Sequence, residues 1–200
     1  MTTPENGIIL PYMNIRIRYN APITLTYSLV AAVLLFLATT LQINLIPGLF
    51  MVPGRGGFDP AYAVHYVTLF THVLGHVDWT HLMGNLAFIL LLGPILEEKH
   101  GSFGLFIMIL ITAVVTGVLN ILIFPSSLLG GSGIVFMMIL LSSFTNIRNG
   151  EIPLTFILIL ILYLATEIIN AFRYDDISQF AHIVGGICGS LFGFMKPRKR

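Results

Sequence analysis

A long run without charge constrains this chain more than any other feature of its sequence. Residues 101–147 contain no Asp, Glu, Lys or Arg. Such a run is typical of membrane spans, because a helix needs about 20 apolar residues to cross roughly 30 Å of hydrocarbon. Pro125-Ser126-Ser127 and the pair Gly130-Gly131 interrupt the run, and these residues break helices. The run therefore predicts two spans separated by a short break.

The second of these two spans is predicted to be short. It starts at Ser132 and ends before Arg148, 16 residues later, which is about 24 Å of helix at 1.5 Å per residue. If Arg148 lies at one membrane face, Ser132 lies below the other. Lipid cannot satisfy backbone groups at that depth, so the glycine loop must line protein or water. We therefore expect a serine at the floor of a wet cavity.

The composition of the whole chain indicates the same class of protein. Of its 200 residues, 56% are hydrophobic and 10% are charged, which excludes an ordinary soluble domain. A net charge of +1 without a basic stripe gives no sign of nucleic-acid binding. Cys188, the one cysteine, excludes an intramolecular disulfide and a thiolate metal cluster. Arg16 and Arg18 precede a span too long for a signal peptide, so we expect none.

The predicted fold is an all-α membrane bundle of six spans. Their approximate ranges are 23–43, 81–96, 103–124, 132–144, 153–172 and 178–194. The apolar, aromatic segment between the first two spans is expected to be a long loop that lies partly in the membrane interface. The chain divides into a short tail (1–20), a six-helix transmembrane domain (21–195) and a basic tail (196–200).

The basic residues predict how this bundle is oriented. Six spans put both termini on one side, and two basic residues, Arg55 and Arg173, fall on the other. Eight fall on the side of the termini: Arg16, Arg18, Lys99, Arg148, Lys196, Arg198, Lys199 and Arg200. Because basic residues favour the cytoplasmic side, both termini are expected in the cytoplasm. The chain has no internal repeat, which weakens the case for a transporter built from inverted halves.

Polar residues from three predicted spans lie at one depth. His81 and Asn85 are 16 and 12 residues before the charged end of their span, or about 24 and 18 Å from it. By the same count Ser132 and His182 lie about 24 and 21 Å from the charged ends of theirs. Polar groups inside spans are costly and usually functional. We therefore expect these four side chains to converge.

Their chemistry suits nucleophilic catalysis. A histidine within reach of a serine hydroxyl can accept its proton, and Ser132 starts a helix whose positive end favours a developing anion. His81 and Asn85, at i and i+4, share a helical face and can both donate to an oxyanion. A stripe of small residues in the span of His182 allows a neighbouring helix to approach closely. These residues are Gly185, Gly189 and Gly193.

Over residues 22–195 the chain resembles the rhomboid intramembrane serine proteases. The matching segments are HVDWTHLMGN at 76–85, Gly130-Gly131-Ser132-Gly133, and Ala181-His182 with the glycines that follow. The resemblance implies Ser132 as nucleophile, His182 as general base, and an oxyanion site of His81, Asn85 and the Ser132 N–H. Five further residues would support the site: Gly130, Gly133, Phe136, Gly185 and Gly189.

The same resemblance implies the reaction. It is hydrolysis, without cofactor or metal, of a peptide bond in or near the transmembrane segment of a single-pass membrane protein. Since the chain has no long extramembrane domain, we expect a bacterial or archaeal cell-membrane protein whose site opens toward the outer face. Two departures stand out. Phe136 replaces the usual tyrosine that stacks on the histidine, and Val67-Thr68 replaces a Trp-Arg pair in the first loop. We expect Phe136 still to stack.

Other interpretations of these residues stay open. A non-proteolytic relative would bind or escort membrane proteins, but such relatives lack the serine or the histidine. A transporter or channel predicts charged pairs along a pathway, which the sequence does not contain. His72 and His76 are interpreted as residues that fix the loop rather than metal ligands, because no HExxH motif is present.

Three more ionisable or reactive residues are interpreted as non-catalytic. We interpret Glu97 as a helix-end or loop-bonding residue and Cys188 as a small core residue. Glu167 is the only acidic residue inside a span, near the depth of Ser132. We expect it to face the cavity or Arg173 rather than to complete a catalytic triad.

Overall fold

The computed structural model describes residues 18–144 and 176–194, together with single positions at 154, 157, 158, 161, 162 and 165. This part of the chain is helical, with one isolated bridge between Val52 and Leu128 in place of strands. Most of the fifth predicted span, with Glu167 and Arg173, lies outside the described residues. The elements are α1 (Pro22–Thr39), α2 (Ile46–Leu49), α3 (Ala63–Thr71), a 3-10 turn (His72–Leu74), α4 (Trp79–His100), α5 (Ser102–Ile123), α6 (Ser132–Phe144) and α8 (Asp176–Phe194).

Three of the described helices are long and apolar enough to cross a membrane: α1, α4 and α5. They confirm the first three predicted spans. The predicted break is also confirmed, because α5 ends at Ile123 and α6 begins at Ser132. The 13 residues described for α6 cover about 20 Å. The count of six spans and the side of the termini remain predictions.

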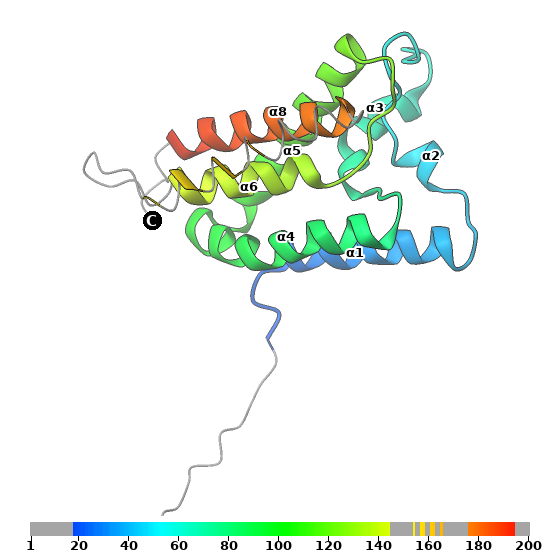
Figure 1. The fold of residues 1–200 in the computed structure, drawn as a ribbon. Helices are drawn as coiled ribbons and strands as arrows, with labels where there is room; N and C mark the ends of the chain where they lie inside the picture. The colour runs from blue at the N-terminus through cyan, green and yellow to red at the C-terminus, as the bar shows by residue number, and fades with distance from the viewer. Residues whose placement is uncertain are drawn as a thin grey trace, which may run out of the picture.

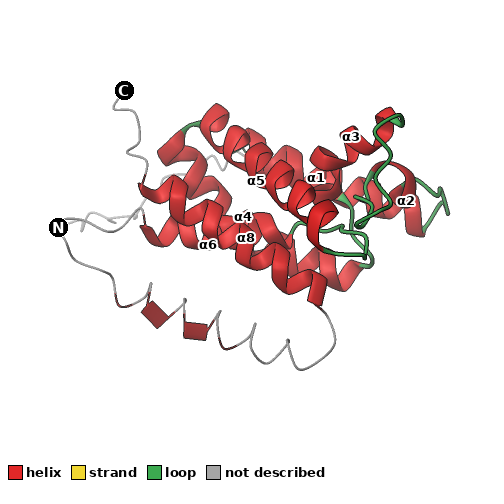
Figure 2. Cartoon of the chain, turned by 90° about the horizontal axis from the view of Figure 1, so that it is seen from above, coloured by secondary structure: helices red, strands yellow, loops and turns green. Residues whose placement is uncertain are grey.

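The segment between α1 and α4 differs from the prediction of a continuous loop. It contains α2, α3 and the 3-10 turn. These elements lie at the end of the bundle opposite the C-terminal end of α4 (Figures 1 and 2). The prediction was wrong for α3 because the prolines and glycines that suggested a loop lie at positions 47–57, before this helix begins. Thr68 and Leu69 of α3 are buried, whereas Tyr62, Tyr66 and Phe70 are among the exposed aromatics.

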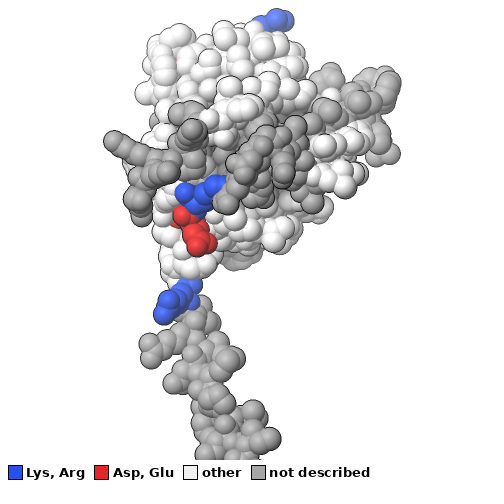
Figure 3. Space-filling model, turned by 90° about the vertical axis from the view of Figure 1, so that its left-hand side faces the viewer, with Lys and Arg blue, Asp and Glu red and all other residues white. Residues whose placement is uncertain are grey.

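A carboxylate from α4 caps the start of α1. Pro22 opens α1, and the first N–H groups of any α-helix have no acceptor inside it. The two oxygens of Glu97 accept from the backbone N–H groups of Ile23 and Thr24 at 2.9 and 3.0 Å, and from the Thr24 hydroxyl at 2.9 Å. This confirms the interpretation of Glu97 as a bonding residue. Charged side chains gather at this end of the molecule (Figure 3).

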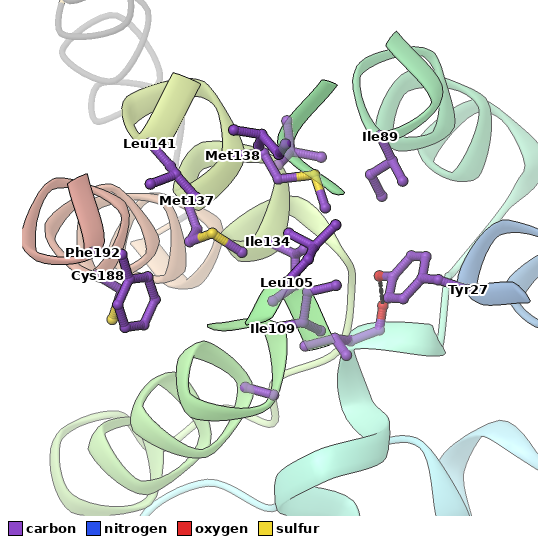
Figure 4. Packing of buried hydrophobic residues seen from close by; sticks show 14 of the residues in the cluster. Tyr27, Ile89, Leu105, Ile109, Ile134, Met137, Met138, Leu141, Cys188 and Phe192 are labelled. Atoms are coloured by element: carbon purple, nitrogen blue, oxygen red, sulfur yellow. Dashed lines mark hydrogen bonds between the residues drawn. The ribbon is translucent and has the colours of Figure 1, made fainter. Parts of the chain in front are cut away.

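The core is built around α6. Figure 1 shows α8, α6, α4 and α1 following one another across the bundle, and α5 also contacts α4, α6 and α8. A helix that is enclosed in this way must be apolar on all sides. Ile134, Met137 and Met138 of α6 accordingly pack with residues of every neighbouring helix (Figure 4). Cys188 is one of these core residues, as expected. Ser132 thus stands at the start of the most enclosed helix described.

Candidate active site

Glycines bring α6 and α8 into backbone contact. A Cβ atom on Gly185 would overlap the backbone of Gly133, and one on Gly189 would overlap the backbone of Met137. On the other helix, a Cβ on Gly133 would lie 3.1 Å from the carbonyl oxygen of Ala181. The helices could not approach this closely with larger side chains. The predicted close contact between these two helices is confirmed.

This contact brings Ser132 and His182 to the same end of the two helices. Ser132 precedes Gly133, and His182 follows Ala181, so each adjoins a residue of the closest approach. One turn after Ser132, the ring of Phe136 lies against that of His182, with centroids 4.2 Å apart and planes tilted by 38°. The ring contact expected for Phe136 is therefore present. Both Ser132 and His182 are partly exposed.

The turn before Ser132 presents the start of α6 to the site. The carbonyl of Gly131 accepts from the N–H groups of Ile134 and Val135, both at 3.0 Å. Gly130 has φ +126°, a conformation that residues with a side chain rarely adopt. The N–H groups that precede Ile134, those of Ser132 and Gly133, have no acceptor within the helix. Such donors, at the positive end of the helix, suit an anion that forms beside Ser132.

The start of α4 brings His81 to the same turn. Asp78 caps this helix, and its Oδ1 atom accepts from the backbone N–H of His81 at 2.7 Å. A Cβ on Gly130 would lie 2.9 Å from Cε1 of His81. The imidazole of His81 therefore lies against the glycine turn, two residues before Ser132. The structure brings together His81 and the Ser132 turn, as the depth argument predicted.

Asn85 is held by His76, for which a loop-fixing role was expected but a bond to Asn85 was not. Its Nδ2 atom lies 2.9 Å from Nε2 of His76, and Asn85 is buried. The Nδ1 atom of His76 lies 3.1 Å from the carbonyl oxygen of Leu74, which can only accept. Nδ1 therefore carries the proton, and Nε2 accepts from the Asn85 amide. Burial lowers the pKa of His76 to about 4, which keeps the ring neutral as this bond requires.

His72 ties the segment before α4 to its surroundings. Its Nε2 atom lies 3.0 Å from the carbonyl oxygen of Ala113 in α5, and burial lowers its pKa to about 4. Its own carbonyl accepts from the N–H of Gly130 at 3.0 Å. The interpretation of His72 and His76 as fixing residues is confirmed. Within the described ranges, no three His, Cys, Asp or Glu side chains are grouped to hold a metal ion.

Comparison with known proteins places this arrangement in a family. Residues 63–199 match the family model described as the Rhomboid domain. Rhomboid-like protein 11, chloroplastic, of Arabidopsis thaliana is 28% identical over 120 residues, 59% of this chain and 40% of that protein. Rhomboid protease GlpG of Haemophilus influenzae is 24% identical over 133 residues, 65% of this chain and 69% of that protein.

A third relative extends the range of organisms. Rhomboid-related protein 1 of Caenorhabditis elegans is 29% identical over 154 residues, 72% of this chain and 43% of that protein. The chain thus spans less than half the length of the plant and worm relatives. The family model covers more than half of the chain and includes α3 to α8. With its apolar helices, the chain is an integral membrane protein that belongs to the rhomboid family.

Proposed function

We propose that this protein is an intramembrane serine endopeptidase that uses Ser132 as nucleophile and His182 as general base. One observation carries the proposal. The glycine contact between α6 and α8 brings the start of α6 beside His182, whose ring packs on Phe136. A catalytic serine needs a base within reach and a base whose ring is oriented. The relative named as a rhomboid protease, GlpG, adds support from outside the chain.

The proposed reaction proceeds through an acyl-enzyme. His182 takes the proton from the Ser132 hydroxyl as its oxygen attacks the carbonyl carbon of the scissile bond. The oxyanion accepts hydrogen bonds from the Ser132 N–H and from the side chains of His81 and Asn85. The intermediate then collapses, and the amine leaves with the proton from His182. Water, deprotonated by His182, attacks the ester; as the bond to the Ser132 oxygen breaks, His182 returns this proton to that oxygen, and the new carboxylic acid leaves and ionises.

The length of α6 supports hydrolysis below the membrane surface. The 13 residues described for α6 cover about 20 Å. From Ser132 to the charged Arg148 there are 16 residues, or about 24 Å of helix against roughly 30 Å of hydrocarbon. If the C-terminal end of α6 is near one membrane face, Ser132 lies below the opposite face. A peptide bond within or near a transmembrane segment is then the bond at the right depth. We propose single-pass membrane proteins as substrates, cleaved from the outer face of a bacterial or archaeal cell membrane.

A fluorophosphonate probe tests the proposal directly. The purified protein in detergent should be modified covalently at Ser132, as mapped by mass spectrometry, and should cleave a model transmembrane substrate in liposomes. Ser132→Ala and His182→Ala should lose both activities and keep the unfolding temperature of the wild type. A folded wild-type protein that neither reacts nor cleaves would leave the non-proteolytic binding factor as the function. Appreciable cleavage by Ser132→Ala would remove Ser132 from its role.

A further inference from the structure

A tyrosine of α1 reaches the segment between α3 and α4. Tyr27 is buried, and its hydroxyl donates to the carbonyl of Val73 in the 3-10 turn. Figure 4 shows the phenol extending from α1 toward this carbonyl. The turn leads into the segment that carries His76 and His81. Tyr27 therefore fixes the backbone that precedes the proposed oxyanion donors.

The same hydroxyl also contacts the turn that carries the proposed nucleophile. A Cβ atom on Gly131 would lie 2.5 Å from the Tyr27 hydroxyl oxygen and 3.2 Å from the carbonyl oxygen of Val73. The phenol oxygen thus occupies the space that a side chain at position 131 would need. Gly131 immediately precedes Ser132, and its carbonyl starts the hydrogen bonding of α6.

The reason for glycine differs between positions 130 and 131. Gly130 has a positive φ of +126°, so its backbone conformation requires glycine. Gly131 is not among the described residues with positive φ, so its conformation would accept any L-residue. Its space is restricted instead, and the nearest atom that restricts it is the Tyr27 hydroxyl oxygen. Tyr27 and Gly131 therefore form a complementary pair.

We propose that Tyr27 is a positioning residue that sets the distance between the Ser132 turn and the segment carrying the oxyanion donors. The proposal rests on the proposed function, since it concerns the same site. The phenol lies between two backbones: it bonds the carbonyl of Val73 on one side and abuts Gly131 on the other. A displacement of about 1 Å between reacting groups can reduce the rate about 10²-fold.

A double-mutant cycle tests the pairing. Gly131→Ala should lower the rate of fluorophosphonate labelling at Ser132 about 10²-fold, because the new methyl group displaces the turn. Tyr27→Phe removes the oxygen that the methyl group meets and should cost about tenfold or less on its own. In the double variant, labelling should recover at least about tenfold over Gly131→Ala. Recovery should appear in kcat for a transmembrane substrate with little change in KM.

Two matched variants separate pairing from a general effect. Tyr19→Phe removes another tyrosine hydroxyl of the same region, which is exposed and bonded to Thr26, and it should not rescue Gly131→Ala. Gly189→Ala introduces a methyl group that meets the backbone of Met137 instead. Tyr27→Phe should not rescue that variant. The proposal would be overturned if Tyr19→Phe rescued Gly131→Ala, or if Tyr27→Phe rescued Gly189→Ala.

Unfolding temperatures in detergent keep the two proposals distinguishable. If the wild type is not labelled, the proposed function fails, and the same cycle measured by unfolding temperature decides whether Tyr27 positions Gly131. If Gly131→Ala does not fold, Tyr27→Phe must restore folded protein in the double variant. The pairing would be overturned if the double variant showed no recovery. In that case its loss of labelling would be the product of the losses in the two single variants, and its loss of unfolding temperature would be their sum, as expected for residues that act independently.

Discussion

On one side of Ser132, α8 packs on α6 through glycines whose backbones touch. On the other side, the segment before α4 is fixed by histidine side chains that bond backbone carbonyls and the Asn85 amide. The first contact depends on volume and involves no titratable group at its closest points. The second depends on hydrogen bonds whose donors and acceptors are set by neutral imidazole rings. The two sides should therefore fail under different perturbations.

Adding volume on the glycine side should have the largest effect. Gly185→Ala places a methyl group into the backbone of Gly133, which cannot move aside as a flexible side chain would. We expect a loss of about 3 kcal/mol or more in the free energy of unfolding. We also expect the rate of fluorophosphonate labelling at Ser132 to fall at least about 10²-fold, because the two helices separate.

An exposed glycine provides the control for this prediction. A Cβ on Gly84 of α4 meets no heavy atom within 4 Å, so Gly84→Ala should keep activity and gain slightly in stability from helix propensity. Activity and unfolding temperature are measured for both variants at one pH. If Gly185→Ala behaved like Gly84→Ala, the two helices would not be in backbone contact.

Removing a donor on the hydrogen-bonded side should lower kcat rather than unfold the protein. For Asn85→Ala we expect a fall of about 10²–10³ in kcat, typical of a lost oxyanion donor, with little change in KM. His76→Ala should give a smaller fall, because it leaves the Asn85 amide present but no longer held. Steady-state cleavage of a model transmembrane substrate separates the two parameters. A change confined to KM in Asn85→Ala would assign Asn85 to substrate binding.

Acid should weaken the hydrogen-bonded side. In the unfolded chain His72 and His76 take up protons below about pH 6.5, whereas in the folded protein they do so only near pH 4. The unfolded state binds more protons between these values, so the free energy of unfolding falls as pH drops from about 6.5 to 4. It is fully recovered above 6.5. We expect each histidine to contribute up to about 3 kcal/mol.

Unfolding curves at pH 7 and pH 5 check this prediction. A drop in unfolding temperature for the wild type that is reduced in His72→Gln would support it. Gly185→Ala should show the same pH-dependent drop as the wild type, since its defect lies on the other side of Ser132. A pH dependence unchanged by loss of His72 would show that other groups titrate in this range.

The sequence predicted the features that local signals mark. The absence of charged residues indicated the spans, and the helix-breaking proline and glycines after Phe124 indicated that α6 starts at Ser132. The backbone contact of α6 and α8 could be expected from the spacing of Gly185 and Gly189. The helix α3 was missed because it has an apolar pattern too short to distinguish from an interfacial loop.

Contacts that no sequence pattern marks could not be predicted. The bond between His76 and Asn85 depends on how a turn folds back on α4, and the Tyr27 contact with Gly131 joins residues far apart in the chain. Neither contact leaves a periodic signal in the sequence. The role of Glu167 remains a prediction, because this residue lies outside the described residues.

The smallest effect is expected from restoring a hydroxyl at Phe136. Its ring already packs on His182 with centroids 4.2 Å apart, and ring contacts of this kind contribute about 0.5–1.5 kcal/mol. Phe136→Tyr keeps that contact and adds only an oxygen, so kcat should change by less than about tenfold. Phe136→Leu removes the ring at similar volume and should lower kcat more, while the unfolding temperature changes little. Cleavage rates of the two variants measure the contribution of the ring itself. If both variants matched the wild type, the orientation of His182 would depend on the backbone contact of α6 and α8 alone, and the glycine side would need no aromatic support.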